Sequence, residues 1–383
     1  MILNYQFFLS LVGTASIYWI IPNQRTRNIF LSVASLLFIA YYDLHAAIIV
    51  IVTSINTFYF AERIQTKQNK AFYHTLGISI LVLLLIILKY LGFLSGTING
   101  ITNFIHGFPV INFNYLLLPL GSSYIIFKQI SYLTDVYWKI TDRGRFDEFI
   151  LYTSLFTIYT AGPIERFERL KPQLGTTGKK FSPGYIEFAF ERIVLGIFKK
   201  AVIADWLGYF IDPIWQYQDR YSFQMRTLAL FGYSIQIYMD FAGYSDIAIG
   251  SSKLFGLTIM ENFKWPYIQP NISQFWRSWH ISLSEWIRDY VFFPLSKLSE
   301  NESWRMLFVP LIAMALCGLW HGPAWHFALW GIWHGAGISF LQYWNLLKRR
   351  NPGLMKITKQ RWFSASGTVF TFLFVTTGWL LFR

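Results

Sequence analysis

The sequence predicts an all-α, polytopic integral membrane protein with about 10–11 membrane helices. Hydrophobic residues make up 54% of the 383 residues and charged residues only 14%, which is too little polar surface to cover a water-soluble exterior. The mean hydropathy is +0.37, and apolar windows long enough to cross a bilayer recur along the chain. Short basic blocks separate these windows. These observations favour a membrane protein over a soluble chain of two or three domains.

The apolar windows give the expected order of the membrane segments. We expect them near residues 5–22, 28–42, 46–62, 74–94, 114–133, 149–165, 193–211, 228–250, 306–322, 325–345 and 365–382. The first 24 residues carry no charge, so the basic start of a cleavable signal peptide is missing. We therefore expect the first segment to be an anchor whose N-terminus lies outside.

Basic and uncharged connections alternate along the first third of the chain. Arg25 and Arg27, then Arg63 with two lysines, then Lys139 with two arginines lie in basic connections, whereas residues 94–113 carry no charge. The positive-inside rule places the basic connections in the cytoplasm, together with the block "KRRNPGLMKITKQR" near the C-terminus. The same rule explains the net charge of +13, so no nucleic acid is expected as a partner.

One apolar segment breaks this alternation. "FILYTSLFTIYTAGPI" has basic residues on both sides, and a single crossing would place one of those blocks on the wrong side of the membrane. We expect a re-entrant or half-crossing element, broken at residues 161–163 (Ala-Gly-Pro). Irregular backbone is tolerated at membrane depth where it is buried in protein or lines a watery cavity. The segment therefore indicates an internal cavity.

Several ionisable residues lie inside apolar runs. Lys199, Lys200 and Asp205 lie in one run, and Asp240 and Asp246 in another. An ionisable side chain at membrane depth costs about 2.5–3.5 kcal/mol on insertion scales, so each has a function or a partner. Two readings stay open: the residues bind a ligand, or lysine–aspartate pairs hold helices together.

The run from Phe275 to Tyr290 has the spacing of one amphipathic helix, with His280 on its aromatic face. It is too charged to span a membrane and is expected at the cytoplasmic interface. Ser273 is the expected cap of its start and Pro294 its expected stop. His280 is either a core histidine bonded to a carbonyl or a functional one.

The stretch "CGLWHGPAWH" places two histidines between apolar runs. His321 precedes Gly-Pro, which must break the helix and make room for a ligand between Trp320 and Trp325. An imidazole with a pKa of about 6.5 is suited to take a proton from a hydroxyl near neutral pH. His326 is the structural or supporting histidine of the pair. Cys317, the single cysteine, is expected to pack between helices rather than to act as a nucleophile.

No metal is expected, because the histidines lack the spacing of a zinc site and no carboxylate lies between them. A single cysteine also excludes a disulfide framework.

Five blocks of the chain resemble the membrane-bound O-acyltransferase family, and most closely its bacterial branch for alginate O-acetylation and teichoic-acid D-alanylation. The blocks are "AGPIERFERLKPQL", "GIFKKAVIAD", "QIYMDFAGYSDIAIG", "NISQFWRSWHISLSEWIRDYVFFPL" and "GLWHGPAWHFALWGIWHG". The family's two signature histidines match His280 in "RSWHISLS" and His321 in "LWHG".

The resemblance implies one membrane domain over residues 1–383, with N-terminal helices at 1–113, a catalytic core at 114–345, and a basic cytoplasmic loop and last helix at 346–383. It implies a central funnel that narrows at the second histidine, and a chain that continues beyond residue 383 in most members.

For chemistry, the resemblance implies acyl transfer from a cytoplasmic thioester donor to a hydroxyl outside. The donor would be acetyl-CoA or an acyl carrier with a phosphopantetheine arm, used as substrate, with no tightly bound cofactor. His321 would be the base, and His280 would orient the substrate or polarise the thioester carbonyl. Candidate substrate-binding residues, in addition to these, are Trp320, Trp325, Trp276, Arg277, Asp240, Lys199 and Lys200.

The favoured function is acetyl transfer towards an extracellular or periplasmic polysaccharide or a partner protein. The expected location is the bacterial cytoplasmic membrane, and the expected partners are the lipid bilayer, a periplasmic or extracellular acetyltransferase or esterase-like protein, and an acyl carrier protein. D-alanyl transfer to teichoic acid is the alternative within the family. An ion-coupled transporter is the alternative outside it, because buried aspartate and lysine also mark ion pathways.

Overall fold

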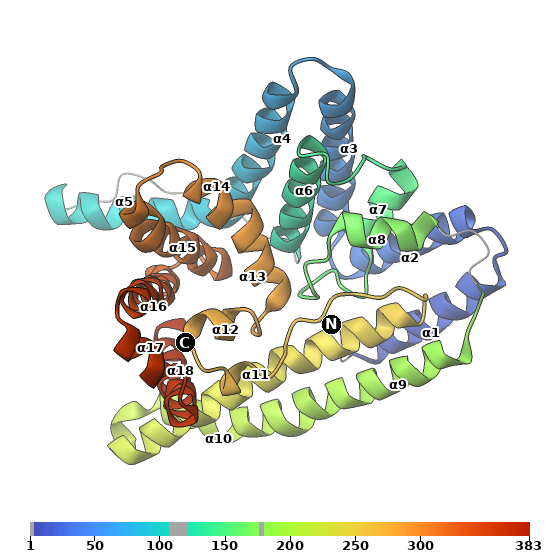
Figure 1. The fold of residues 1–383 in the computed structure, drawn as a ribbon. Coiled ribbons are helices and arrows are strands. Elements are labelled where there is room, and N and C mark those ends of the chain that lie inside the picture. Colours follow the sequence, from blue (N-terminus) through green and yellow to red (C-terminus); the bar gives the residue numbers. More distant parts are fainter. Residues whose placement is uncertain (1–3, 107–118, 120, 176–179) are drawn as a thin grey trace. The chain divides into compact units, whose positions relative to one another are not determined.

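The computed structural model describes residues 4–106, 119, 121–175 and 180–383, and all regular secondary structure in these ranges is helical (Figure 1). The chain divides into two compact units. Unit 1 comprises residues Met1–Ile193 and Ile247–Met260, and unit 2 comprises Val194–Asp246 and Glu261–Arg383. The prediction of an all-α protein is confirmed.

Four helices in the described residues are long and apolar enough to cross a membrane. They are Leu44–Thr66, Lys70–Thr102, Trp304–His321 and Arg361–Phe382. They agree with the expected polytopic membrane protein, although the expected number of membrane segments was larger. Two of the other expected segments are shorter in the structure, since the helices Tyr5–Ile20 and Ser122–Tyr137 have 16 residues each.

Unit 1 contains the helices α1 (Tyr5–Ile20), α2 (Gln24–Tyr42), α3 (Leu44–Thr66), α4 (Lys70–Leu85), α5 (Leu91–His106), α6 (Ser122–Tyr137), α7 (Phe146–Ser154), α8 (Phe167–Gly175) and most of α9 (Pro183–Ile197). A π-helical turn, Ile86–Tyr90, joins α4 to α5. Each of the first four helices begins at an asparagine or aspartate whose side chain accepts a backbone N–H. Such caps satisfy N–H groups that the helix itself cannot pair.

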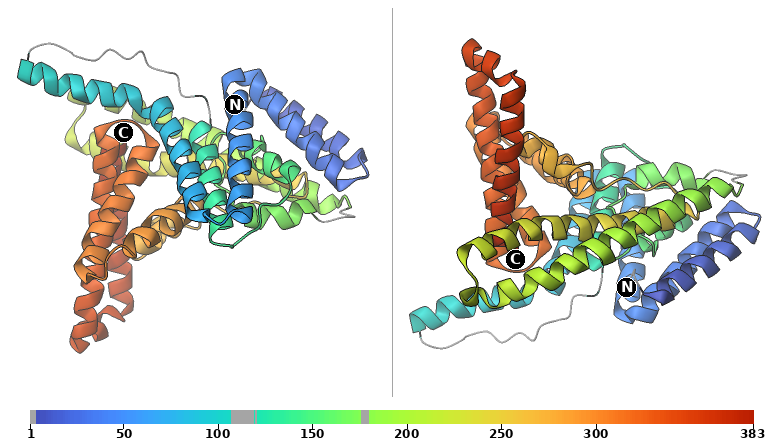
Figure 2. Two further views of the ribbon diagram at one scale, coloured as in Figure 1. Left: turned by 90° about the horizontal axis from the view of Figure 1, so that it is seen from above. Right: turned by 90° about the horizontal axis from the view of Figure 1, so that it is seen from below.

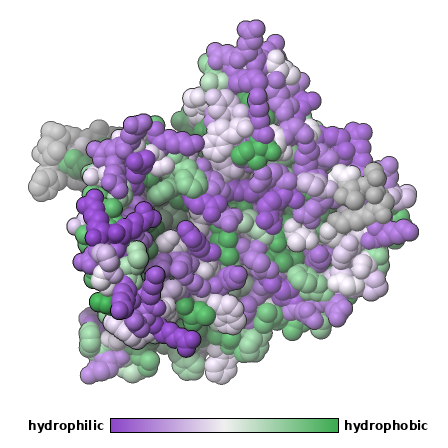
Figure 3. Space-filling model, viewed as in Figure 1, coloured by the Kyte–Doolittle hydropathy of each residue, from purple (hydrophilic) through white to green (hydrophobic). Residues whose placement is uncertain are grey.

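Polar residues gather at the connections of unit 1. Hydrophilic side chains cover the connection between α3 and α4 at the top of Figure 3. In the loop after α6, Asp142 accepts a hydrogen bond from Lys171, which lowers the pKa of the Asp142 carboxyl. Glu62 of α3 and Arg143 of the same loop form an ion pair of 3.0 Å. The connections that the sequence predicted to be basic therefore carry paired charges.

The predicted broken segment is confirmed, but the break lies earlier than expected. α7 ends at Ser154, and residues 155–166 are non-helical, whereas the expected break was at 161–163. Most of these residues are buried, and Glu165 is fully buried. Tyr152 donates a hydrogen bond to the Glu165 carbonyl (3.0 Å). Irregular backbone is thus covered by protein, as its burial requires.

Unit 2 contains the end of α9, then α10 (Asp205–Gln216), most of α11 (Phe223–Lys253), α12 (Ile272–Trp276), α13 (Ile281–Ile287), α14 (Phe293–Ser296), α15 (Val309–His321), α16 (Trp325–Arg350), α17 (Pro352–Thr358) and α18 (Arg361–Phe382). π-helical turns precede α10, α14 and α15 at Phe198–Ala204, Arg288–Phe292 and Trp304–Phe308. The predicted cytoplasmic basic loop therefore contains α17.

The helices α15 and α16 form a hairpin around the predicted break. Gly322 has an extended backbone and α16 starts at Trp325, so the expected break is confirmed. The two helices lie side by side, as the orange and red helices of Figure 2 show. A Cβ at Gly318 would lie 2.1 Å from the Phe327 carbonyl oxygen, and one at Gly331 would lie 2.0 Å from that of Met314. Small residues allow such close backbone approach between membrane helices.

We expect Gly318→Ala to destabilise the protein by about 1–3 kcal/mol, because the added methyl group must push the two helices of this hairpin apart. Thermal unfolding of the full chain in detergent measures the effect. Gly13→Ala is the matched control, since a Cβ at Gly13 meets nothing within 4 Å. Equal melting temperatures for the two variants would contradict the close packing of α15 on α16.

Candidate active site

His280 lies at a sharp turn between α12 and α13, and not inside one helix over 275–290 as predicted. Its backbone is left-handed (φ 42°), and its side chain is 1% exposed. The Asn262 carbonyl accepts the Ile281 N–H (2.9 Å), and the Asn262 side chain accepts the Ser282 hydroxyl (2.7 Å). These bonds tie the start of α13 to the non-helical segment that contains Asn262, so the chain turns at His280. Strained backbone of this kind gathers at functional sites.

Two further expectations for this region were wrong. The cap of α12 is Asn271, whose side chain accepts the Gln274 N–H, and not Ser273. Pro294 does not stop the helix, because α13, the π-helical turn and α14 continue from residue 281 to 296. Pro294 lies in the first turn of α14, and a proline is tolerated where helical geometry changes.

His321 is the last residue of α15 and is half-buried. Its ring centre lies 4.9 Å from that of Trp320, 5.2 Å from Trp330 and 5.1 Å from Phe382. The Trp320 ring also contacts His280, at 6.2 Å. The structure therefore places the two predicted histidines on either side of one buried tryptophan, although 41 positions separate them in the chain.

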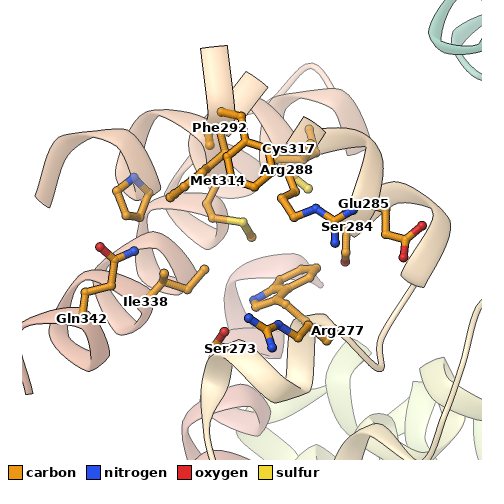
Figure 4. Close-up of a pocket in the computed structure, with 15 residues that line it drawn as sticks. Ser273, Arg277, Ser284, Glu285, Arg288, Phe292, Met314, Cys317, Ile338 and Gln342 are labelled. Atoms are coloured by element: carbon orange, nitrogen blue, oxygen red, sulfur yellow. The ribbon is translucent and has the colours of Figure 1, made fainter. Parts of the chain in front are cut away.

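A cavity of about 440 Å³ is lined by Trp276, whose ring centre lies 5.7 Å from that of Trp330 in this cluster, whereas His280, His321 and Trp320 are not among its lining residues (Figure 4). Trp276 and Cys317 belong to its wall, and Met314, Ile338 and Phe292 make much of the remainder apolar. Arg277 and Arg288 extend into it from the two sides, together with Ser273, Ser284, Glu285 and Gln342, as Figure 4 shows. An apolar cavity with a few converging polar groups has the size and chemistry of a small-molecule site.

The lysines and aspartates predicted to bind substrate form ion pairs. Lys200 Nζ lies 2.6 Å from carboxylate oxygens of both Asp205 and Asp240. Lys199 Nζ lies 2.6 Å from Asp246. These contacts join the π-helical turn before α10 to α11. The geometry agrees with the reading in which lysine–aspartate pairs hold helices together.

We expect Lys199→Met to lower the free energy of unfolding by about 1.5–3 kcal/mol, because it removes a charge-assisted hydrogen bond to the buried Asp246 carboxylate. The double variant Lys199→Met/Asp246→Asn should recover at least half of the loss. Chemical denaturation in detergent measures both. Acyl-transfer activity per folded molecule of Lys199→Met should stay unchanged. A rise in the donor KM of this variant would instead show that Lys199 binds the donor.

Three further residues of the predicted stretch, Trp325, His326 and Cys317, differ in their surroundings. Trp325 is 61% exposed at the start of α16. His326 Nδ1 lies 3.0 Å from the Leu381 carbonyl oxygen, so it ties α16 to the end of α18. Cys317 is buried in the cavity wall and forms no disulfide. Among the described residues, no three histidine, cysteine, aspartate or glutamate side chains form a candidate metal-binding group.

Residues 139–378 match the family model of the membrane-bound O-acyltransferases. This chain belongs to the membrane-bound O-acyltransferase family. It is 34% identical to a probable alginate O-acetylase of Pseudomonas putida over 99% of this chain and 76% of that protein. It is 30% identical to a peptidoglycan O-acetyltransferase of Helicobacter pylori (94% of this chain, 72% of that protein) and 27% identical to a teichoic acid D-alanyltransferase of Bacillus subtilis (94% and 90%). These relatives are bacterial membrane-family proteins, so the chain is a bacterial membrane O-acyltransferase.

In this O-acyltransferase, sequence reasoning missed Arg288, Trp330 and His334. Arg288 lies in the run from Phe275 to Tyr290 that the sequence predicted to be a charged amphipathic helix. The sequence does contain a pattern that could have identified Trp330 and His334, because the triplet Trp-His-Gly occurs twice, at 320–322 and 333–335. The second triplet follows Trp330 and contains His334, and both side chains are fully buried beside the His321 cluster.

Proposed function

We propose that this protein transfers acetyl groups from a cytoplasmic thioester donor towards a hydroxyl of an extracellular or periplasmic polysaccharide or of a partner protein. The observation that carries the proposal is the placement of His280 and His321 against the buried Trp320, beside a cavity with two arginines. The similarity to a probable alginate O-acetylase and to a peptidoglycan O-acetyltransferase supports a polysaccharide acceptor.

In the proposed reaction, neutral His321 takes the proton of the acceptor hydroxyl, whose oxygen attacks the thioester carbonyl carbon. A C–O bond forms, the C–S bond breaks, and His321 returns the proton to the departing thiolate. The products are an ester and a free thiol, so the step balances without a further reactant. His280, held at its turn by the bonds of Asn262 to α13, would orient the thioester.

The cavity beside the histidines suits the arm of a thioester donor. Its apolar wall would hold the chain of a pantetheine, and Arg277 and Arg288 would bind phosphate. Arg277 is exposed and forms no ion pair with the described residues, whereas Arg288 contacts Asp289 (2.8 Å). Guanidinium groups bind phosphate through paired N–H donors. Acetyl-CoA and a carrier-bound phosphopantetheine share this chemistry.

Location and partners follow from the same proposal. The protein would lie in the bacterial cytoplasmic membrane with its N-terminus outside and its basic connections in the cytoplasm. A funnel would admit the acceptor from outside. An esterase-like or acetyltransferase protein there would complete transfer to the polymer, and an acyl carrier protein is the alternative donor on the cytoplasmic side.

The experiment is a transfer assay on the full chain in sealed vesicles. Radiolabelled acetyl-CoA is supplied on the cytoplasmic side, and a polysaccharide with its periplasmic partner on the other. Label on the polysaccharide supports the proposal. Label only with an alanyl-carrier donor would support D-alanylation instead, and solute uptake without acyl transfer would support the transporter.

A further inference from the structure

His334 of α16 is fully buried, and neither of its ring nitrogens has a hydrogen-bond partner among the described residues. A buried polar atom without a partner costs about 1–3 kcal/mol, and native proteins contain few such atoms. His326 contacts the Leu381 carbonyl and His74 contacts the Thr134 hydroxyl, whereas Nε2 of the predicted site residue His280 is, like His334, buried without a partner among the described residues. His334 therefore does not fit the usual core histidine that is bonded to a carbonyl.

Aromatic rings surround His334. Its ring centre lies 4.9 Å from Trp330, 5.2 Å from Trp276 and 6.3 Å from Phe275. On the α18 side, a Cβ at Gly378 would lie 2.9 Å from His334 Nε2, so this nitrogen faces a helix position without a side chain. None of these neighbours supplies a carboxylate or a carbonyl to the imidazole.

The two tryptophans beside His334 share its lack of partners. Trp276 Nε1 and Trp330 Nε1 are buried and donate to no described group. Nearby tryptophans are bonded: Trp333 donates to the Phe374 carbonyl (3.1 Å) and Trp379 to the Tyr267 hydroxyl (3.2 Å). Trp215 Nε1 of α10 also has no partner among the described residues, so such atoms occur elsewhere in this unit, but around His334 three neighbouring rings share the feature.

Trp330 lies between the unpaired nitrogens of His334 and the proposed base, His321. Its ring contacts both His334 and His321, and Trp276 also lines the donor cavity. An indole nitrogen is only a donor, whereas a neutral imidazole is one donor and one acceptor. Water and alcohols have an oxygen that both donates and accepts hydrogen bonds. The two indole nitrogens can donate to such an oxygen, and the imidazole can donate to it or accept from it.

We propose that His334, Trp330 and Trp276 form an oxygen-binding pocket next to His321. The pocket holds ordered water in the resting protein, and the acceptor hydroxyl replaces this water before transfer. His334 is a positioning residue, which accepts or donates a hydrogen bond so that the acceptor oxygen faces His321. This inference rests on the proposed acyl transfer.

The test compares His334→Phe with His334→Gln in the vesicle transfer assay. His334→Phe keeps a flat ring and removes both unpaired nitrogens, so a purely structural His334 would tolerate it with equal or higher melting temperature and unchanged transfer. We expect instead about a 10- to 100-fold fall in transfer, expressed as a higher acceptor KM at unchanged donor KM. Gln restores a donor and an acceptor and should recover part of the loss. His74→Phe is the control and should transfer normally.

A second pair of variants keeps the test decisive if His334→Phe fails to fold. Trp330→Phe removes the unpaired N–H, and Trp333→Phe removes a bonded one. Only the first should raise the acceptor KM. Hydroxyl-radical footprinting of the wild type should label Trp330, which water would touch, more than the bonded and equally buried Trp379.

The outcomes separate the two proposals. If His321→Ala abolishes transfer but His334→Phe and Trp330→Phe leave it unchanged, the oxygen-binding pocket is overturned. The proposed acyl transfer then still stands. Absence of footprinting at Trp330 also counts against the pocket. Wild-type protein that transfers no acyl group from any thioester donor overturns the proposed function.

Discussion

His321→Ala should lower acyl transfer by about 100- to 10,000-fold, the usual contribution of a general base. The reason is geometric as well as chemical. His321 is half-buried at the end of α15, next to a helix break, so its ring is reachable by a substrate. Donor binding should persist, because the two arginines of the cavity are unchanged. Steady-state transfer with labelled acetyl-CoA and equilibrium donor binding measure the two effects separately.

His326→Ala is the matched control for this variant. His326 lies on the other side of the same break, and its imidazole contacts the Leu381 carbonyl and the Phe327 ring. We expect a lower melting temperature and nearly normal transfer per folded molecule. If His321→Ala keeps normal transfer, the base lies elsewhere. If it changes the uptake of a solute instead, the transporter alternative gains support.

The double variant Arg277→Met/Arg288→Met should raise the donor KM by about 10- to 100-fold and leave kcat nearly unchanged. Both guanidinium groups are partly exposed, so solvent screening reduces their combined contribution to about 1.4–2.8 kcal/mol, and loss of uniform binding changes KM alone. The effect should be the same for acetyl-CoA and for a phosphopantetheine-linked donor, because the phosphate is common to both. It should shrink at high salt, which screens exposed charges.

Lys297→Met controls for the change in net charge. Lys297 is an exposed cation just after α14, outside the cavity wall. Its removal should leave the donor KM unchanged. An unchanged KM in the double arginine variant, or an equal rise in both variants, would show that the cavity does not recognise the donor phosphate through these side chains.

The sequence was a reliable guide where the physical signal is local. The Gly-Pro pair after His321 predicts the break that the structure contains, because proline cannot continue a helix. Basic residues on both sides of residues 149–165 predict an interrupted segment, and α7 ends at Ser154. The motifs around His280 and His321 identify the two histidines that the fold brings to one tryptophan.

Prediction failed where distant residues override local spacing. The periodicity from Phe275 to Tyr290 indicates one helix, but bonds from Asn262 to the start of α13 turn the chain at His280. Trp325 follows the same break as His321, yet it lies mostly exposed in this chain. Periodicity reports which faces are apolar, and it does not report which distant backbone will compete for a helix's hydrogen bonds.

By itself, the sequence determined that this protein is an all-α membrane protein with a helix break after His321, because hydropathy, charge and proline act over a few neighbouring residues. Its motifs indicated O-acyl transfer through their resemblance to a known family. Only the tertiary structure decided which polar groups have partners. It paired Lys199 and Lys200 with aspartates, and it left the ring nitrogens of His334 unpaired among the described residues. A hydrogen bond depends on atoms about 3 Å apart in space, and sequence spacing does not specify that distance for residues on different helices.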